Sequence, residues 1–179
     1  MSWHLRKMKM NELIQKIEQW ANDRNIIKGS KPIDQAMKLF SEFGELADNV
    51  GKGRDCRDDI GDIFVVLTII AQQAELNINE SVKLRNNNRS LNACLKKQVN
   101  WLCSSLSLFV TDLGLYTLGN CVENLMQISK ILGYTLEECV QIAYNDIKDR
   151  KGIMSNGVFI KESDPAYASI IASIESNCE

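Results

Sequence analysis

The sequence predicts an all-α protein, an antiparallel bundle of about six helices with a short C-terminal hairpin. Two observations carry this prediction. Apolar residues recur at helical spacing in six separate segments of the chain. Only one stretch, residues 153–160, has the pattern of a β-hairpin, with a tight turn at Asn156-Gly157. With 179 residues, 45% hydrophobic and 25% charged, the chain has the size and composition of one globular domain.

The helical segments follow one another with short connections. Ser30 and Pro32 mark the start of the second helix, and Thr135 with Glu138 three residues later forms a capping box at the start of the sixth. In the second helix we expect the core-facing side chains to be Ile33, Ala36, Met37, Phe40, Phe43, Ala47 and Val50. The third is apolar around almost its whole circumference, which predicts a buried central helix. The expected helices are residues 11–24, 32–50, 55–74, 90–112, 120–132 and 135–151.

Composition excludes several classes of function. With a net charge of -2, the chain lacks the excess of positive charge that is typical of proteins that bind a nucleic acid polymer. Six cysteines without a CxxC pair, and no secretory signal, predict a cytoplasmic protein with reduced thiols. No apolar run reaches the length of a membrane span. The single histidine, His4, rules out histidine-dependent nucleophile pairs and a two-histidine zinc motif.

Two acidic pairs are the strongest functional signal. Glu42 and Glu45 lie on the second helix, and Asp59 and Asp62 lie on the third. Residues three apart share one face of a helix, so each pair presents two carboxylates together. Four clustered anions repel one another unless a cation lies between them. Oxygen ligands in this number suit Mg²⁺, with Mn²⁺ as a second possibility, and predict a metal site that binds phosphates.

Each pair also has a structural interpretation. Asp58 and Asp59 suit a helix N-terminus, where the dipole favours anions. Glu42 and Glu45 suit the solvated edge of an amphipathic helix. Asp62 fits neither, because it is the only charge in the apolar run from Ile60 to Ala71.

Each acidic pair encloses a glycine, Gly44 in the first and Gly61 in the second. A helical glycine costs about 1 kcal/mol relative to alanine. We therefore expect a ligand or a neighbouring helix to approach closely at both positions.

A second cluster of polar residues ends the sixth helix. Asn145, Lys148, Arg150 and Lys151 are candidate substrate-binding residues, because lysine and arginine bind phosphate charge. Cations also stabilise helix C-termini, and that effect alone would account for two of them.

These motifs resemble the MazG-like nucleotide pyrophosphohydrolases of the all-α NTP pyrophosphatase superfamily. The matching stretches are Glu42-Phe43-Gly44-Glu45-Leu46, residues 58–64 (DDIGDIF) and residues 143–152, and residues 143–159 look most like small phage or prophage members. The resemblance implies metal-dependent hydrolysis of a (deoxy)nucleoside triphosphate to the monophosphate and pyrophosphate. Glu42, Glu45, Asp59 and Asp62 would hold the metal, Glu42 or Glu45 would act as general base, and a homodimer or homotetramer is implied.

The chain departs from the family pattern in two places. Asp59 stands where the family usually has glutamate, so Asp58 is an alternative third ligand. Residues 78–132 have no counterpart in the shortest members, which implies one domain over residues 1–162 with a helical insertion. Residues 163–179 would then be a tail, either a short helix or disordered.

Three alternatives stay open. One is a dUTPase-like hydrolase of dUTP or dUDP on a similar bundle. The others are a helical interaction module, and a non-catalytic homologue that binds nucleotides.

Overall fold

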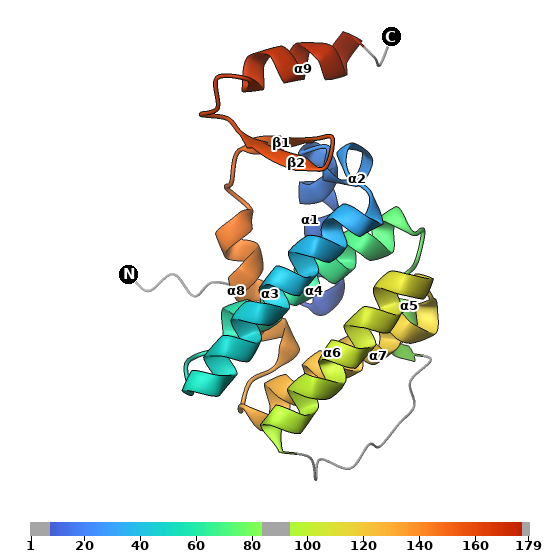
Figure 1. The fold of residues 1–179 in the computed structure, drawn as a ribbon, viewed down its shortest axis with the longest axis vertical. Helices are drawn as coiled ribbons and strands as arrows, with labels where there is room; N and C mark the ends of the chain where they lie inside the picture. The colour runs from blue at the N-terminus through green and yellow to red at the C-terminus, as the bar shows by residue number, and fades with distance from the viewer. Residues whose placement is uncertain (1–7, 84–93, 177–179) are drawn as a thin grey trace.

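The computed structural model describes residues 8–83 and 94–176, and within them the chain is all-α with one small antiparallel hairpin, as predicted (Figure 1). The strands are β1 (Gly152–Ser155) and β2 (Val158–Lys161), paired so that Met154 lies opposite Phe159. The helices are α1 (Met10–Asp23), α2 (Ile26–Gly29), α3 (Pro32–Lys52), α4 (Arg57–Gln73), α5 (Ile78–Lys83), α6 (Leu95–Asp112), α7 (Leu115–Ile131), α8 (Leu136–Ile147) and α9 (Tyr167–Ser176).

The central helix is α4, which packs against α8 and α3 and also contacts α1, α2 and α7. Every residue from Asp59 to Ala71 is buried except Asp62. Gly61 permits the close approach of α8, because a Cβ atom there would lie 2.2 Å from the carbonyl oxygen of Cys139. The prediction of a buried central helix is confirmed, and neighbours within the same chain cover it.

The two helices α6 and α7 form a second layer, with α5 packed on α7 (Figure 1). Their contact includes a buried polar pair, in which Gln98 Nε2 donates to Asn124 Oδ1 at 2.6 Å. The predicted start of the fifth helix at residue 120 is wrong: α7 starts directly after Gly114, and Gly119 is buried inside it. The sequence pattern also missed α5. The predicted start of the fourth helix, at residue 90, lies outside the described residues.

The buried side of α3 differs from the predicted one. The helix buries Gln35, Ala36, Leu39, Glu42 and Leu46, whereas Ile33, Met37 and Phe40 are exposed by 59%, 58% and 36%. The apolar sector of α3 is wider than the surface that its neighbours within the chain cover. Apolar periodicity identifies this sector but not the part of it that faces α4.

The segment between α1 and α3 contains the short helix α2, where the sequence predicts only a connection. The cap of α3 is Lys31, whose N–H donates to Asp34 Oδ2 at 2.8 Å, and not Ser30. Ser30 instead donates to the carbonyl of Ile26 at 2.7 Å. The capping box of Thr135 and Glu138 at α8 is confirmed.

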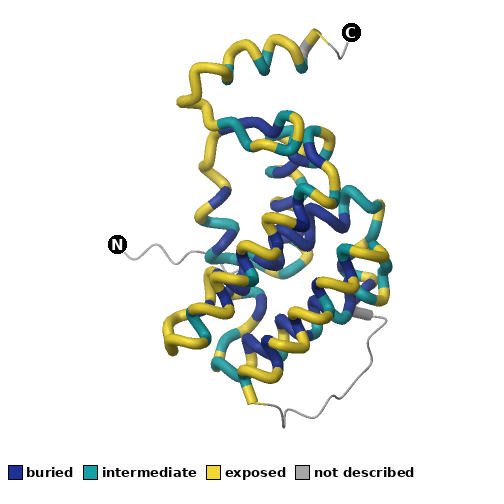
Figure 2. The backbone as a smooth tube through the Cα atoms, in the orientation of Figure 1, coloured by how far each residue is buried: buried dark blue, intermediate teal, exposed yellow. Residues whose placement is uncertain are grey.

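The hairpin covers the end of the bundle where α1 meets α2, and backbone hydrogen bonds hold it there. Met154 N–H donates to Arg24 O, and Gly157 N–H donates to Gly29 O, both at 2.8 Å. Helix α8 ends at Ile147, so Arg150 and Lys151 lie in the connection to β1 and not on the helix. The tail forms α9, which stands beyond the hairpin and is largely exposed (Figure 2). Among the described residues, no helix has both the length and the apolar character needed to cross a membrane.

Candidate functional site

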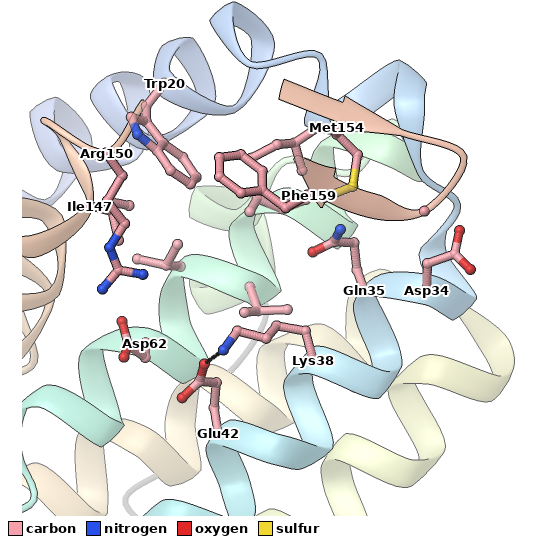
Figure 3. Close-up of a pocket in the computed structure, with 15 residues that line it drawn as sticks. Trp20, Asp34, Gln35, Lys38, Glu42, Asp62, Ile147, Arg150, Met154 and Phe159 are labelled. Atoms are coloured by element: carbon pink, nitrogen blue, oxygen red, sulfur yellow. Dashed lines mark ion pairs between the residues drawn. The ribbon is translucent and has the colours of Figure 1, made fainter. Parts of the chain in front are cut away.

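A cavity of about 320 Å³ opens between α3, α4, the end of α8 and the hairpin (Figure 3). This is within the size range of small-ligand pockets. One end carries charged side chains and the other is mostly apolar. The lining residues are Trp20, Ile26, Asp34, Gln35, Lys38, Glu42, Asp62, Val65, Val66, Ile69, Ile147, Arg150, Met154, Gly157 and Phe159.

Two of the predicted acidic residues, Glu42 and Asp62, line the charged end of this cavity. Glu42 is only 4% exposed and forms an ion pair with Lys38, one turn earlier on α3. Figure 3 shows Asp62 on the adjacent helix α4, with the guanidinium group of Arg150 pointing toward it. The helices α3 and α4 therefore bring one carboxylate from each predicted pair to the same space, with two cations beside them.

The electrostatics of this end reflect crowded negative charge. Burial, then the charges of Glu42 and Asp58, raise the pKa of Asp62 to about 7, although Arg150 and Lys38 oppose the shift. The pKa of Asp58 is raised by burial, then by Asp146, Glu42 and Glu45, and Arg150 again opposes the shift. Such a cluster favours either bound protons or a bound cation.

The other two predicted ligands, Glu45 and Asp59, do not line the cavity. Glu45 is exposed. Asp59 is 7% exposed and accepts a hydrogen bond of 2.9 Å from Asn49 Nδ2. Burial raises the pKa of Asp59, and the hydrogen bond from Asn49 opposes this shift. Within the described residues, no three acidic, cysteine or histidine side chains converge to hold a metal ion.

Of the four predicted substrate-binding residues, only Arg150 lines the cavity. Lys148 and Lys151 are exposed, and Lys151 forms an ion pair with Glu162 at 3.4 Å. Asn145 accepts a hydrogen bond of 3.3 Å from Gln141 on the same helix. Of the predicted substrate-binding residues, Arg150 therefore lies at the cavity, and Asn145, Lys148 and Lys151 do not.

Arg24, at the end of α1, fixes the backbone that carries Arg150. Its Nε donates to the carbonyl of Arg150 at 2.6 Å, and its Nη2 donates to the carbonyl of Lys148 at 3.1 Å. Its guanidinium group lies over the ring of Trp20, 5.1 Å from the centroid. Arg24 therefore ties the connection after α8 to α1 on the rim of the cavity.

The apolar end of the cavity has two aromatic walls. Trp20 and Phe159 approach it from α1 and β2, with Met154 between the hairpin and the core (Figure 3). The indole Nε1 of Trp20 is buried and has no hydrogen-bond partner among the described residues. Gln35 and Asp34 add polar groups at the α3 side. A flat, partly polar ligand would fit between such walls.

Sequence reasoning missed Lys38, Trp20, Gln35 and Phe159 as cavity residues. A signal existed for Lys38, because it lies four residues before Glu42 on a helix, where opposite charges pair. Trp20 and Phe159 have no such signal. They are apolar residues on distant segments, and only the tertiary fold brings them together.

The curated relative found for this chain comes from a phage. The chain is 48% identical, over 66 residues, to an uncharacterized 18.2 kDa protein from the rep-hol intergenic region of Haemophilus phage HP1 (strain HP1c1). The match covers 36% of this chain and 40% of the phage protein, well under two thirds of either. No family model matches the sequence, and no solved structure matches it.

Proposed function

We propose that this protein hydrolyses nucleoside triphosphates to the monophosphate and pyrophosphate with the help of a divalent cation. The observation that carries the proposal is the two-ended cavity. Its charged end combines Glu42 and Asp62 with Lys38 and Arg150, and its other end is aromatic. A nucleotide has the same division, with phosphates at one end and a flat base at the other. The resemblance of the acidic motifs to MazG-like enzymes supports the same substrate class.

The donor chemistry of the charged end suits Mg²⁺ or Mn²⁺. All candidate ligands are carboxylate oxygens, and burial, followed by the charges of Glu42 and Asp58, raises the pKa of Asp62 to about 7. Lys38 forms an ion pair with Glu42, so a metal ion would compete with Lys38 for this carboxylate. A bound divalent ion would neutralise phosphate charge and acidify a bound water.

The side chains of this chain then have separate roles. Glu42 and Asp62 would hold the ion from the adjacent helices α3 and α4, and Arg150 would neutralise the departing phosphates. Either Glu42 or Glu45 would accept the proton of the attacking water. Trp20 and Phe159 would contact the base.

Asp58 is better placed than Asp59 as a third ligand. Glu42 raises the pKa of all three aspartates, whereas Arg150 lowers the pKa of Asp58 and Asp62 only. Asp59 is held by Asn49, and Arg150 is not among the groups that shift its pKa.

The test is pyrophosphate release from a panel of ribo- and deoxyribonucleotides that includes dUTP, with Mg²⁺ or Mn²⁺ present. Glu42→Gln and Asp62→Asn should each reduce kcat by at least about 100-fold, because each removes a charge at the reacting end. Asp58→Asn should reduce it more than Asp59→Asn. The matched controls Glu80→Gln and Asp164→Asn alter exposed acids outside the cavity and should leave kcat unchanged.

Near wild-type pyrophosphate release by folded Glu42→Gln would place the reaction elsewhere. Release of pyrophosphate from dUTP and from no other nucleotide of the panel would favour the dUTPase-like alternative.

One observation favours a second candidate, nucleotide binding without hydrolysis. The acidic side chains do not converge on a single point among the described residues, and Lys38 already neutralises Glu42. Calorimetry with a non-hydrolysable triphosphate separates the two candidates. Binding without any turnover across the panel would support the second.

A further inference from the structure

Helix α3 has a second apolar face that nothing in the described chain covers. The six residues of this face are all exposed, and we call them the outer stripe: Ile33, Met37, Phe40, Gly44, Ala47 and Gly51. Their spacing alternates between four and three residues over the length of the helix. This is the heptad spacing by which one helix packs along another.

The side chains of the outer stripe are large in its first half and small in its second half. Its first half carries three large side chains, two of them 58% and 59% exposed. Its second half carries only glycine and alanine. Cβ atoms built at Gly44 and Gly51 would meet nothing within 4 Å. Two glycines in one helix cost roughly 2 kcal/mol relative to alanine, and no contact among the described residues explains them.

We propose that the outer stripe binds the outer stripe of a second copy of this chain, with the two α3 helices antiparallel. In this arrangement Ile33 lies opposite Gly51 of the second copy, Met37 opposite Ala47, and Phe40 opposite Gly44. In an antiparallel pair, facing positions have residue numbers with a constant sum. The three pairs share the same sum, so a single register brings all of them together. Each large side chain meets a small residue, and the reciprocal pairs repeat the match, as a two-fold interface requires.

A parallel arrangement lacks this complementarity. It would place Phe40 against Phe40, and it would leave the glycine half of both helices without side chains to fill the space between them. Size matching between large and small residues is what allows close helix packing without voids. The sequence of α3 therefore specifies the direction of the pairing as well as its existence.

The available area suits a stable dimer. From Ile33 to Gly51 the stripe extends about 27 Å, at 1.5 Å per residue. Helix α6 packs beside α3 and lies with it at the front of the molecule in Figure 1. Helix α6 carries two exposed apolar side chains, Trp101 and Leu108, which are exposed by 45% and 59%. Two adjacent helices of about 10 Å width give a projected area of about 540 Å². The corrugated accessible surface is larger than this projection and approaches the ~800 Å² per partner of a standard interface.

The interface is tested by sedimentation velocity across a dilution series, in chelator and without nucleotide, so the outcome does not depend on the proposed function. The wild-type chain of 20.2 kDa should sediment as a dimer at micromolar concentration. Met37→Arg should shift it to monomer, because a charge is buried in the interface. Its matched control, Met126→Arg, changes an exposed methionine on α7 and should leave the dimer intact. A wild-type monomer at about 100 μM, or a dimeric Met37→Arg variant, would overturn the proposal.

The variant Gly44→Leu tests the dimer interface without destabilising the fold of the single chain. Leucine is a better helix former than glycine and meets open space in the single chain, so the monomer should be as stable as wild type or more so. In the dimer the added side chain occupies the place of Phe40 of the second copy. We expect at least a 10-fold rise in the dissociation constant, with an unchanged or higher Tm for the monomer. A dimer unaffected by Gly44→Leu would contradict the pairing.

Direction is tested with a photo-crosslinking amino acid at position 33. The antiparallel register predicts crosslinks to the peptide that contains Gly51, about 27 Å along the helix from position 33. Crosslinks to the second copy's own position 33 would show a parallel pair and refute the register.

Discussion

The two glycines inside the acidic pairs occupy opposite environments. Gly61 is buried in α4, and a Cβ atom there would lie 2.2 Å from the carbonyl oxygen of Cys139 and 2.7 Å from Ala143 Cβ. Gly44 is exposed on α3, and a Cβ atom there would meet nothing within 4 Å. The same local sequence, an acid followed two residues later by glycine, therefore has two different causes. One glycine permits helix packing within the chain, and the other leaves an open surface.

The difference extends to the two helices as a whole. Neighbours within the chain cover α4 from Asp59 to Ala71, apart from Asp62 at the cavity. Helix α3 divides its surface among the core, the cavity and the outer stripe. The stability of the single chain should therefore depend strongly on α4 and weakly on the outer side of α3.

The largest expected effect is that of Gly61→Ala. A methyl group at this position forces α4 and α8 apart, and we expect a loss of about 3 kcal/mol. For a chain of this length the loss corresponds to a fall in Tm on the order of 10 °C. Thermal unfolding in chelator measures it.

A thiol assay shows whether the lost stability comes from the contact between α4 and α8. Cys139 lies at this contact, and burial raises its pKa to about 11, so it should react slowly with iodoacetamide at pH 8. Gly61→Ala should accelerate its alkylation. The exposed Cys103 on α6 should react at an unchanged rate and is the internal control. Wild-type stability of Gly61→Ala would mean that α4 and α8 do not pack this closely.

An intermediate effect is expected from Asp62→Asn in metal-free protein. The folded state raises the pKa of Asp62 to about 7, so the unfolded state ionises this carboxyl at lower pH than the folded state does. The folded state therefore loses stability as the pH rises from about 4 to 7. Asp62→Asn should gain about 1–2 kcal/mol over wild type at pH 8 and almost nothing at pH 4. This is less than a fully buried carboxylate would give, because the side chain is partly exposed.

The Asp62 prediction is checked by urea unfolding in EDTA at both pH values. Addition of Mg²⁺ should reverse the ranking at pH 8, since only the wild type retains the carboxylate. An equal difference at pH 4 and pH 8 would show that the asparagine acts through packing and not through charge.

The smallest effect is that of Gly44→Ala. The added methyl group meets open space and improves helix propensity, so the gain should be at most about 1 kcal/mol, or roughly 3 °C in Tm. Alanine remains small enough for the proposed pairing of α3, unlike leucine. A loss of stability would show that Gly44 faces a neighbour within the chain.

The sequence allowed prediction of the helices whose apolar residues contact one another within the chain. α1, α4 and α8 agree with their patterns, because their buried residues are apolar and follow the helical period. The pattern failed on α3, where two apolar faces adjoin and periodicity cannot tell the core from an outer surface. It also failed at Gly119, since a glycine inside a buried helix resembles a turn.

The candidate site was predictable only in part, for a similar reason. Carboxylates three residues apart on a helix are visible in the sequence, and Glu42 and Asp62 line the cavity as expected. Asp59 points to Asn49 instead, because two helical positions three residues apart still differ by about 60° in direction. The aromatic end depends on how α1, α4 and the hairpin meet, which local patterns do not encode.

The hydrogen bonds of Arg24 limit where recombination between related genes can leave the fold intact. Arg24 and the carbonyl of Arg150 are 126 positions apart in the sequence, yet they meet at 2.6 Å. Arg24 O and Gly29 O also bind the hairpin through Met154 and Gly157. A recombination event within α3 to α8 would separate these partners and leave both acidic helices intact. Chimeras of related proteins should therefore keep the segment from Arg24 to Gly29 and the hairpin from the same parent, even when the middle of the gene is exchanged.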